Sequence, residues 1–131
     1  LLYSSLFLAC SVNAQNQFNQ NNILKAEEAF ILNAQLTDNV INASWQIAAE
    51  HYLYKDSIKV IINNEAIAHE FILLNESVIN DEFFGESLVL QNTLVVRAVY
   101  NSTDLQNAII TIEYQGCAAG KYCYPKQRRN I

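Results

Sequence analysis

The sequence predicts an all-β protein, an antiparallel β-sandwich formed by a single domain. Short apolar runs recur at roughly ten-residue spacing and are separated by turn signals such as Thr37-Asp38-Asn39 and Asn63-Asn64. No long segment has the 3.6-residue period of a helix. The chain has 131 residues, which is enough for one modest core and too few for two. These observations together predict the sandwich.

The expected strands follow the apolar runs in chain order. They are residues 29–36, 40–48, 52–54, 58–62, 67–74, 87–90, 94–100 and 108–114. Residues 25–30 are expected to form one helical turn before the first strand. Trp45 lies in the middle of its run among apolar residues with the two-residue period of a strand, so we expect it to anchor the core.

The first residues are interpreted as a targeting segment that lies outside the fold. The sequence has no Met, and residues 1–12 are apolar and uncharged, with the length of a signal-peptide core and too short to span a bilayer. Ala14 offers a cleavage site before Gln15. A buried first strand and a lipoprotein signal at Cys10 are the alternatives. The expected organisation is a truncated signal peptide, a polar flexible lead-in and the β domain, over residues 1–14, 15–28 and 29–131.

Composition and charge exclude two classes of protein. Half of the residues (51%) are hydrophobic, which excludes a disordered tail. The net charge of −5 lacks the basic surplus typical of nucleic-acid binding. Residues 65–86 carry six acidic and no basic residues, and four basic residues follow Glu113. We expect a solvated acidic face and a basic tail leading into a linker; the alternative places Asp81 and Glu82 against the cysteine loop.

Most catalytic motifs are absent from the sequence. His51 and His69 have no H-E-x-x-H pattern, so a zinc hydrolase is not indicated and no metal site is predicted. No glycine-rich phosphate loop or G-x-S-x-G turn occurs. The remaining candidate is the segment from Cys117 to Cys123, which holds the two cysteines left once residues 1–14 are removed.

A disulfide between Cys117 and Cys123 would be a weak structural staple. Closing a loop of about seven residues stabilises by roughly 2.4 kcal/mol, against about 4.7 kcal/mol for a hundred-residue loop. Gly116 and Gly120 allow a tight turn that leaves sulfur accessible, and Lys121 would favour thiolate. The spacing therefore leaves two interpretations open, a reversible redox bond and a purely structural one.

Three separated motifs resemble one family. Residues 114–125 (YQGCA…CYP) are similar to the active-site hairpin of the N-terminal periplasmic domain of the DsbD thiol:disulfide interchange proteins. Residues 45–54 resemble the family's W-Q-I…Y-Y-L-Y segment, and residues 81–85 (DEFFG) resemble its cap loop. The order and spacing agree over residues 26–125.

The resemblance implies a fold and an activity. The family domain is an immunoglobulin-like β-sandwich that acts as a protein-disulfide reductase in the bacterial periplasm, with a redox-active disulfide and no other cofactor. Its dithiol reduces periplasmic disulfide isomerases and the thioredoxin-like protein of cytochrome c maturation. The thioredoxin-like C-terminal domain of the same polypeptide reduces it again, supplied with electrons through an inner-membrane domain. Those domains lie outside this sequence, and the implied membrane association is only through them.

The resemblance also implies residue roles. Cys123 matches the cysteine that forms the mixed disulfide with partners, and Cys117 would resolve it. Phe83 matches an aromatic residue that shields the sulfurs. Asp81 and Glu82 match acids that tune the thiol pKa or transfer protons, and Tyr52 and Tyr54 match aromatic residues that flank the site. Phe84 and Gly85 belong to the cap loop. Lys121, near the cysteines, departs from the family pattern.

Departures and alternatives accompany these roles. Lys121 lies where the family commonly has an acid nearby, so we expect a lower thiol pKa, measurable by alkylation rates. In the alternative interpretation of these residues, the two tyrosines serve packing alone, residues 83–84 are core, and residues 81–82 form a solvated turn. The competing function is an exported immunoglobulin-like binding module with a structural disulfide.

Overall fold

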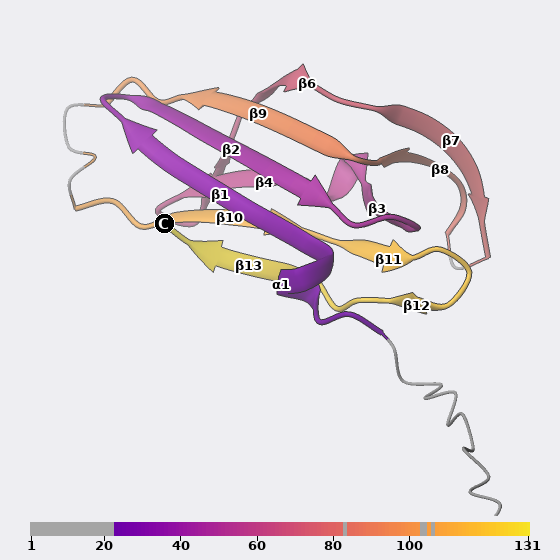
Figure 1. The fold of residues 1–131 in the computed structure, drawn as a ribbon. Coiled ribbons are helices and arrows are strands. Elements are labelled where there is room, and N and C mark those ends of the chain that lie inside the picture. The colour runs from indigo at the N-terminus through magenta and orange to yellow at the C-terminus, as the bar shows by residue number, and fades with distance from the viewer. Residues whose placement is uncertain (1–22, 83, 103–104, 106) are drawn as a thin grey trace, which may run out of the picture.

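The computed structural model describes residues 23–82, 84–102, 105 and 107–131. Within these residues the structure is nearly all β (Figure 1). The helical pieces of this part of the chain are one turn, α1 (Ala26–Ala29), and a short 3-10 turn, η1 (Lys55–Ser57). The helical turn expected over residues 25–30 is therefore confirmed.

The strands form three antiparallel sheets. The first sheet has the order β1 (Phe30–Thr37), β2 (Val40–Ile47), β9 (Thr93–Val99) and β6 (Glu70–Leu73). The second has the order β13 (Gln127–Asn130), β10 (Ile110–Tyr114), β4 (Lys59–Ile62) and β5 (Glu65–Ile67). The third has the order β12 (Tyr122–Cys123), β11 (Gly116–Ala118), β3 (His51–Tyr54), β8 (Gly85–Leu90) and β7 (Glu76–Asp81).

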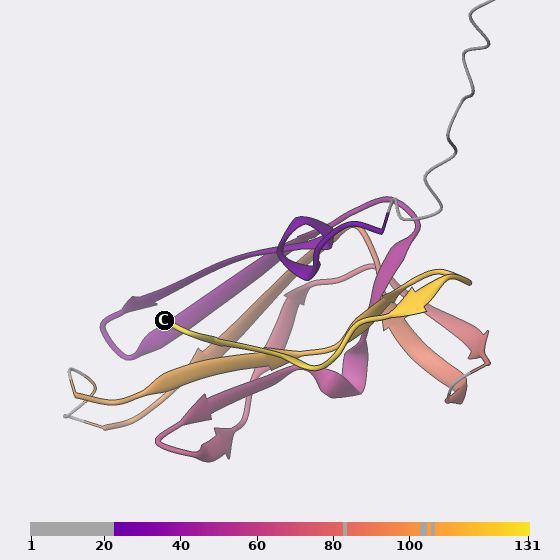
Figure 2. The same ribbon diagram turned by 90° about the horizontal axis from the view of Figure 1, so that it is seen from below.

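The first two sheets form the two layers of a sandwich, and the third sheet lies at one end of it (Figures 1 and 2). The β11–β12 and β7–β8 hairpins both belong to this third sheet and project from that end. The predicted β-sandwich is confirmed, and the cysteine hairpin lies at one end of it, with Ala118 of β11 packed in the main core.

The core follows from the alternation of side chains along the strands. On β2 every second residue is buried, which directs Trp45 and its apolar neighbours inward. The Trp45 ring is completely buried and packs edge-on against Tyr114 of β10, with 5.6 Å between ring centroids. Trp45 therefore joins the first sheet to the second, as the sequence predicted.

The apolar run over residues 67–74 is not one strand. Its start belongs to β5, which pairs with β4, and its end belongs to β6, which pairs with β9 in the other layer. The chain crosses between the two sheets at Ala68 and His69, which lie in neither strand. A continuous apolar run does not distinguish a single strand from two strands that face the same core from opposite sheets.

The basic end of the chain is also different from the prediction. Residues 127–130 form β13, which pairs with β10, so the expected tail is wrong for this segment. Glu113 of β10 is only 5% exposed, and its carboxylate forms ion pairs with Lys126 and Arg128. Lys126 and Arg128 thus compensate the charge of a buried acid. The basic residues that indicated a tail lie in or next to β13, the strand that pairs with β10.

The N-terminal part of the described chain is attached to the domain. The backbone carbonyl of Leu24 accepts a hydrogen bond from the Tyr124 hydroxyl at 2.6 Å, and Ala29 at the end of α1 is buried in the core. The domain contacts therefore begin before residue 29. The predicted signal peptide, residues 1–14, lies outside the described residues. No helix in the described part of the chain is both long and apolar enough to cross a membrane.

Candidate functional site

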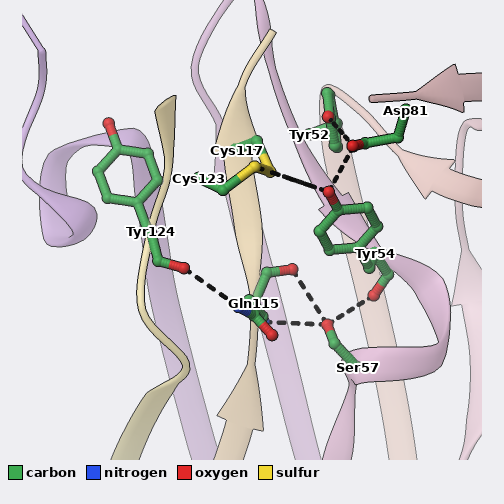
Figure 3. The surroundings of a disulfide bond; sticks show 8 residues. All are labelled: Tyr52, Tyr54, Ser57, Asp81, Gln115, Cys117, Cys123 and Tyr124. Atoms are coloured by element: carbon green, nitrogen blue, oxygen red, sulfur yellow. Dashed lines mark hydrogen bonds between the residues drawn. A yellow bond between two sulfur atoms is a disulfide. The ribbon is translucent and has the colours of Figure 1, made fainter. Parts of the chain in front are cut away.

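The β11–β12 hairpin brings the two cysteines together. Cys117 and Cys123 are directly opposite one another in the strand register, with 4.0 Å between their Cα atoms, and their sulfurs form a disulfide (Figure 3). Gly120 in the connecting turn has a φ of 69°, a conformation that suits glycine. The Cys117–Cys123 disulfide, which both interpretations of the spacing assume, is therefore present in the structure.

Gly116 is required for a different reason from the one expected. It has no left-handed φ, and instead lets β11 lie very close to β3. A Cβ atom at this position would lie 2.2 Å from the Tyr52 carbonyl oxygen and 2.9 Å from a Leu53 methyl carbon. Gly116 therefore sets the distance between the strand that carries the disulfide and the strand that carries the tyrosines.

The two sulfurs differ in accessibility. Cys117 is 1% exposed and packs in a small cluster with Tyr52, Tyr54 and Val89. Cys123 is only partly buried and lies at the edge of that cluster. Of the two, Cys123 is the sulfur that an approaching molecule meets first.

A buried tyrosine–aspartate network faces the disulfide (Figure 3). Both Tyr52 and Tyr54, on β3, donate hydrogen bonds to the same carboxylate oxygen of Asp81, at the end of β7; the Tyr52 bond measures 2.5 Å. The Tyr54 hydroxyl also lies 3.1 Å from the sulfur of Cys117 and 3.7 Å from that of Cys123. Asp81 is 6% exposed, so residue 81 is no part of a solvated turn.

Burial keeps both hydroxyls protonated. Burial, followed by the hydrogen bond to Asp81, raises the pKa of Tyr52 to about 12. Burial and the hydrogen bonds to Asp81 and Tyr52 raise the pKa of Tyr54 well above its usual range. Both tyrosines are therefore protonated at neutral pH, and each donates its one hydroxyl proton to Asp81.

The cap loop is the turn between β7 and β8. Phe84 packs edge-on against the Tyr54 ring with 5.2 Å between centroids, yet it is 63% exposed, so it is not a core residue. Gly85 has a φ of 72°, which favours glycine. Glu82 is exposed at the rim of the site. Phe83, the predicted shielding residue, lies outside the described residues.

Lys121 occupies the turn of the cysteine hairpin. Its backbone N–H donates to the Ala118 carbonyl at 3.0 Å, and the residue is exposed. It takes part in no ion pair within the described residues. Its predicted effect on the thiols remains a prediction.

Two site residues were missed by the sequence analysis. Ser57 in η1 donates to the Tyr54 carbonyl at 2.6 Å and accepts from the Gln115 backbone N–H at 2.9 Å, while the Tyr54 N–H donates to the Gln115 carbonyl at 2.9 Å. These bonds fasten the end of β3 to the start of the cysteine hairpin (Figure 3). Ser57 and Gln115 are 58 positions apart, and no local motif marks either of them.

Open grooves lie on both sides of the network. One, of about 430 Å³, is lined by residues that include Tyr52, Asp81, Gly120 and Cys123. The other, of about 590 Å³, is lined by residues that include Tyr54 and Phe84. Cys123 lines the first groove, whereas the second reaches Tyr54 and the cap loop without touching either cysteine.

Comparison with known proteins identifies the family. Residues 20–131 match the family described as "Thiol:disulfide interchange protein DsbD, N-terminal". The chain is 37% identical over 128 residues to the thiol:disulfide interchange protein DsbD of Haemophilus ducreyi, covering 97% of this chain and 22% of that protein. It is 34% identical over 132 residues to the DsbD of Photorhabdus laumondii, covering 100% of this chain and 23% of that protein. The chain thus spans less than a quarter of the length of these relatives.

Solved structures agree with this relationship. The reduced DsbD N-terminal domain of Neisseria meningitidis matches with a TM-score of 0.74 and 27% identity, over 86% of this chain and 90% of that one. A second match, with a TM-score of 0.61 and 25% identity over 85% and 88% of the two chains, comes from a complex between the DsbD N-terminal and PilB N-terminal domains of the same organism. The predicted immunoglobulin-like fold is confirmed. With its sequence matched from residue 20 to residue 131, the chain belongs to the family of DsbD N-terminal domains.

Proposed function

We propose that this domain is a dithiol–disulfide electron carrier that reduces the disulfides of periplasmic proteins. In this proposal Cys123 is the attacking sulfur and Cys117 is the resolving sulfur. The observation that carries the proposal is the difference between them: one sulfur is buried beside a proton-donating network, and the other is partly exposed at a groove. A purely structural disulfide has no need of this asymmetry.

The first step is a thiol–disulfide exchange at Cys123. The Cys123 thiolate attacks one sulfur of the partner's disulfide, a new intermolecular S–S bond forms, and the partner's second sulfur leaves as a thiolate that takes up a proton. Attack requires a line of approach to the sulfur. The groove lined by Tyr52, Gly120 and Cys123 supports that approach.

The second step resolves the mixed disulfide. Cys117, directly opposite Cys123 in the hairpin, loses its proton and attacks the Cys123 sulfur. The Cys117–Cys123 bond forms again, and the partner's remaining sulfur leaves as a thiolate. Two electrons and two protons have then passed from the domain to the partner, which is reduced to a dithiol.

The Tyr54 hydroxyl supports the charge that develops on sulfur. It lies within hydrogen-bonding distance of both sulfurs and of Asp81, and its raised pKa keeps its proton in place. That proton is donated to Asp81, so Tyr54 stabilises a thiolate when its hydroxyl rotates from Asp81 toward sulfur.

The electron source and the partners come from the family relationship. We infer that a thioredoxin-like C-terminal domain of the same polypeptide reduces the disulfide, and that disulfide isomerases and a thioredoxin-like protein of cytochrome c maturation accept the electrons in the periplasm. The complex of the DsbD N-terminal domain with the PilB N-terminal domain in Neisseria meningitidis supports recognition of a protein partner.

Trapping tests the proposal directly. Cys117→Ala removes the resolving sulfur, so we expect Cys123 to accumulate a mixed disulfide with an oxidised thioredoxin-like protein, seen as a band that disappears under reducing conditions. The matched control is Cys123→Ala, which leaves only the buried sulfur of the pair and should trap little or none. Both variants also carry Cys10→Ala, which removes the third cysteine of the sequence. Equal trapping by the two variants would contradict the assigned roles, and no trapping by either would contradict the electron-carrier function.

The reduction potential separates this function from a binding module with a structural disulfide. Structural disulfides have potentials below about −300 mV, whereas exchanging ones are more easily reduced. We expect the Cys117–Cys123 bond to equilibrate with a thiol redox buffer above that value, measured by alkylation of the freed thiols. A potential below about −300 mV would instead favour the binding module.

A further inference from the structure

Three potential metal-ligand atoms converge at the end of the third sheet. The sulfurs of Cys117 and Cys123 and a carboxylate oxygen of Asp81 all lie within 4.8 Å of one another. Cys117 and Asp81 are buried, and Cys123 is partly buried. Two cysteine sulfurs and one carboxylate form a donor set that suits zinc and similar thiophilic divalent cations.

We propose that the reduced form of this domain binds one thiophilic divalent cation, of the zinc type, through Cys117, Cys123 and Asp81. A reductant first converts the disulfide to two thiols. The cation then replaces the two thiol protons, which pass to solvent, and it undergoes no change of oxidation state. Three protein ligands leave a fourth position for water, as in open tetrahedral sites.

The backbone geometry is compatible with this coordination. Ligand atoms around a tetrahedral zinc ion lie about 3.5–3.8 Å apart, given metal–ligand distances near 2.0–2.3 Å. The carboxylate must therefore approach the sulfurs by about 1 Å, and the sulfurs must separate once their bond is broken. Cys123 can supply much of this movement, since it is partly exposed and belongs to the two-residue strand β12, which pairs only with β11 among the described strands.

The surroundings of Asp81 supply the outer shell of the site. Tyr52 and Tyr54 both donate hydrogen bonds to its carboxylate, an arrangement that orients metal-binding carboxylates in proteins. The groove of about 430 Å³ lined by Tyr52, Asp81 and Cys123 gives the ion a path from solvent. The site therefore has three ligands, outer-shell hydrogen-bond donors and a path from solvent. The S–S bond prevents the two sulfurs from binding a cation until it is reduced.

The proposal does not rest on the electron-carrier function. It requires only that a chemical reductant opens the disulfide, so the metal titration uses no redox partner. A negative titration leaves the trapping result standing, and a negative trapping result leaves the titration standing. If both hold, the cation and a partner's disulfide compete for the same two sulfurs.

Cobalt(II) is the probe, because its thiolate complexes absorb light where the free ion does not. The chain is reduced with a phosphine, freed of reductant without oxygen and titrated with cobalt(II). We expect a thiolate-to-cobalt charge-transfer band that saturates at one equivalent, with tetrahedral ligand-field bands that zinc(II) abolishes by displacement. The oxidised chain is the control and should show neither. Absence of the charge-transfer band from the reduced chain would overturn the proposal.

A pair of matched variants tests the third ligand. Asp81→Asn should weaken cobalt(II) binding by at least about tenfold. Glu86→Gln removes one carboxylate charge from the same β7–β8 hairpin and should leave the affinity within about twofold of wild type. Unchanged affinity and spectrum in Asp81→Asn would overturn the three-ligand site.

Alkylation of the unmodified chain provides an independent measurement if Asp81→Asn does not fold. One equivalent of zinc(II) should slow the reaction of the Cys117 and Cys123 thiols with iodoacetamide by at least about tenfold, and a chelator should restore the rate. Equal rates with and without zinc(II) would overturn the proposal without reference to any variant.

Discussion

The sandwich and the third sheet of this domain bury different kinds of side chain. Between the first two sheets, aliphatic residues surround Trp45 in one large cluster. At the end of the molecule, a small cluster contains Tyr52, Tyr54 and Cys117 beside the buried Asp81. The sandwich is stabilised by removal of apolar area from water. The third sheet contributes Leu53, Leu90 and Ala118 to the same core and adds hydrogen bonds and a covalent link at its far end. The reactive groups therefore gather at one end of the domain, beyond the large apolar cluster.

The separation makes substitutions in the two regions distinguishable. Loss of sandwich packing should lower the free energy of unfolding without changing the chemistry of the folded disulfide. Changes in the third sheet should alter that chemistry with a smaller effect on stability.

Trp45→Ala should be the most destabilising change. Removing a fully buried Trp side chain costs about 3–5 kcal/mol, and the Trp45 indole N–H has no hydrogen-bond partner among the described residues, so the loss is one of packing. Urea unfolding of the oxidised protein measures it. The reduction potential of the folded fraction should match that of wild type, and a shifted potential would contradict the separation of the two regions.

Gly116→Ala should affect both regions, because Gly116 packs against Tyr52 of the third sheet and Phe30 of the first sheet. The added Cβ would lie 2.2 Å from the Tyr52 carbonyl oxygen and 2.8 Å from the Phe30 ring, so β11 and β3 must move apart. We expect a loss of about 3 kcal/mol together with a changed rate of disulfide reduction. Gly120→Ala is the control, since nothing lies within 4 Å of its added Cβ; it should cost about 1 kcal/mol through its positive φ and leave the Tyr52 contact unchanged. A Gly116→Ala variant as stable as wild type would contradict the close approach.

Alkaline pH should weaken the third sheet through its tyrosines. The pKa of Tyr52 is about 12 in the folded protein and about 10 when unfolded. The unfolded chain therefore releases this proton first, and the free energy of unfolding falls as pH rises from about 10 to 12, by about 3 kcal/mol for this group. Below about pH 10 the contribution of Tyr52 is fully present.

Tyr52→Phe tests this pH dependence. The variant should show a shallower fall in the free energy of unfolding over the same interval, measured by urea unfolding at a series of pH values. Tyr122→Phe, which removes a hydroxyl outside the Asp81 network, is the control and should change the profile less than Tyr52→Phe does. A Tyr52→Phe profile parallel to wild type would contradict the burial of this hydroxyl.

Removal of the disulfide should leave a folded protein. The short loop that it closes predicts a loss of about 2.4 kcal/mol, which is less than the sandwich core supplies. The Cys117→Ala/Cys123→Ala variant should therefore unfold cooperatively at a lower urea concentration and keep the near-ultraviolet signal of Trp45. Loss of that signal in native buffer would show that the disulfide also supports the sandwich.

Phe84→Ala should have the smallest effect on stability and a measurable effect on reactivity. The exposed ring has one edge-to-face contact, with Tyr54, and such pairs contribute about 0.5–1.5 kcal/mol. We expect a cost near 0.5 kcal/mol and a faster reduction of the disulfide by dithiothreitol. Leu88→Ala, on the same hairpin, is the control. Equal reduction rates for both variants and wild type would show that the Phe84 ring, packed on Tyr54, does not restrict access to the disulfide.

The predictability of the molecule from its sequence follows the same division. The alternation that places Trp45 in the core is local, and the structure confirms it. The strand pairs made by residues 67–74 and 127–130 were not predictable, because pairing depends on partners distant in sequence. At the site, the motifs indicated the cysteines, the two tyrosines and Asp81, whereas the bonds between Ser57 and Gln115 carry no local signal.

The sequence by itself determined the strand periodicity, the apolar core positions and the short spacing of the two cysteines, since each depends on neighbours within one strand or one turn. Only the tertiary structure decided which sulfur is buried and which carboxylate meets the sulfurs. Tyr52 reaches Asp81 across 29 positions of the chain, because β8 pairs with both β3 and β7. Such contacts are set by the order and register of strands, which a local pattern does not encode.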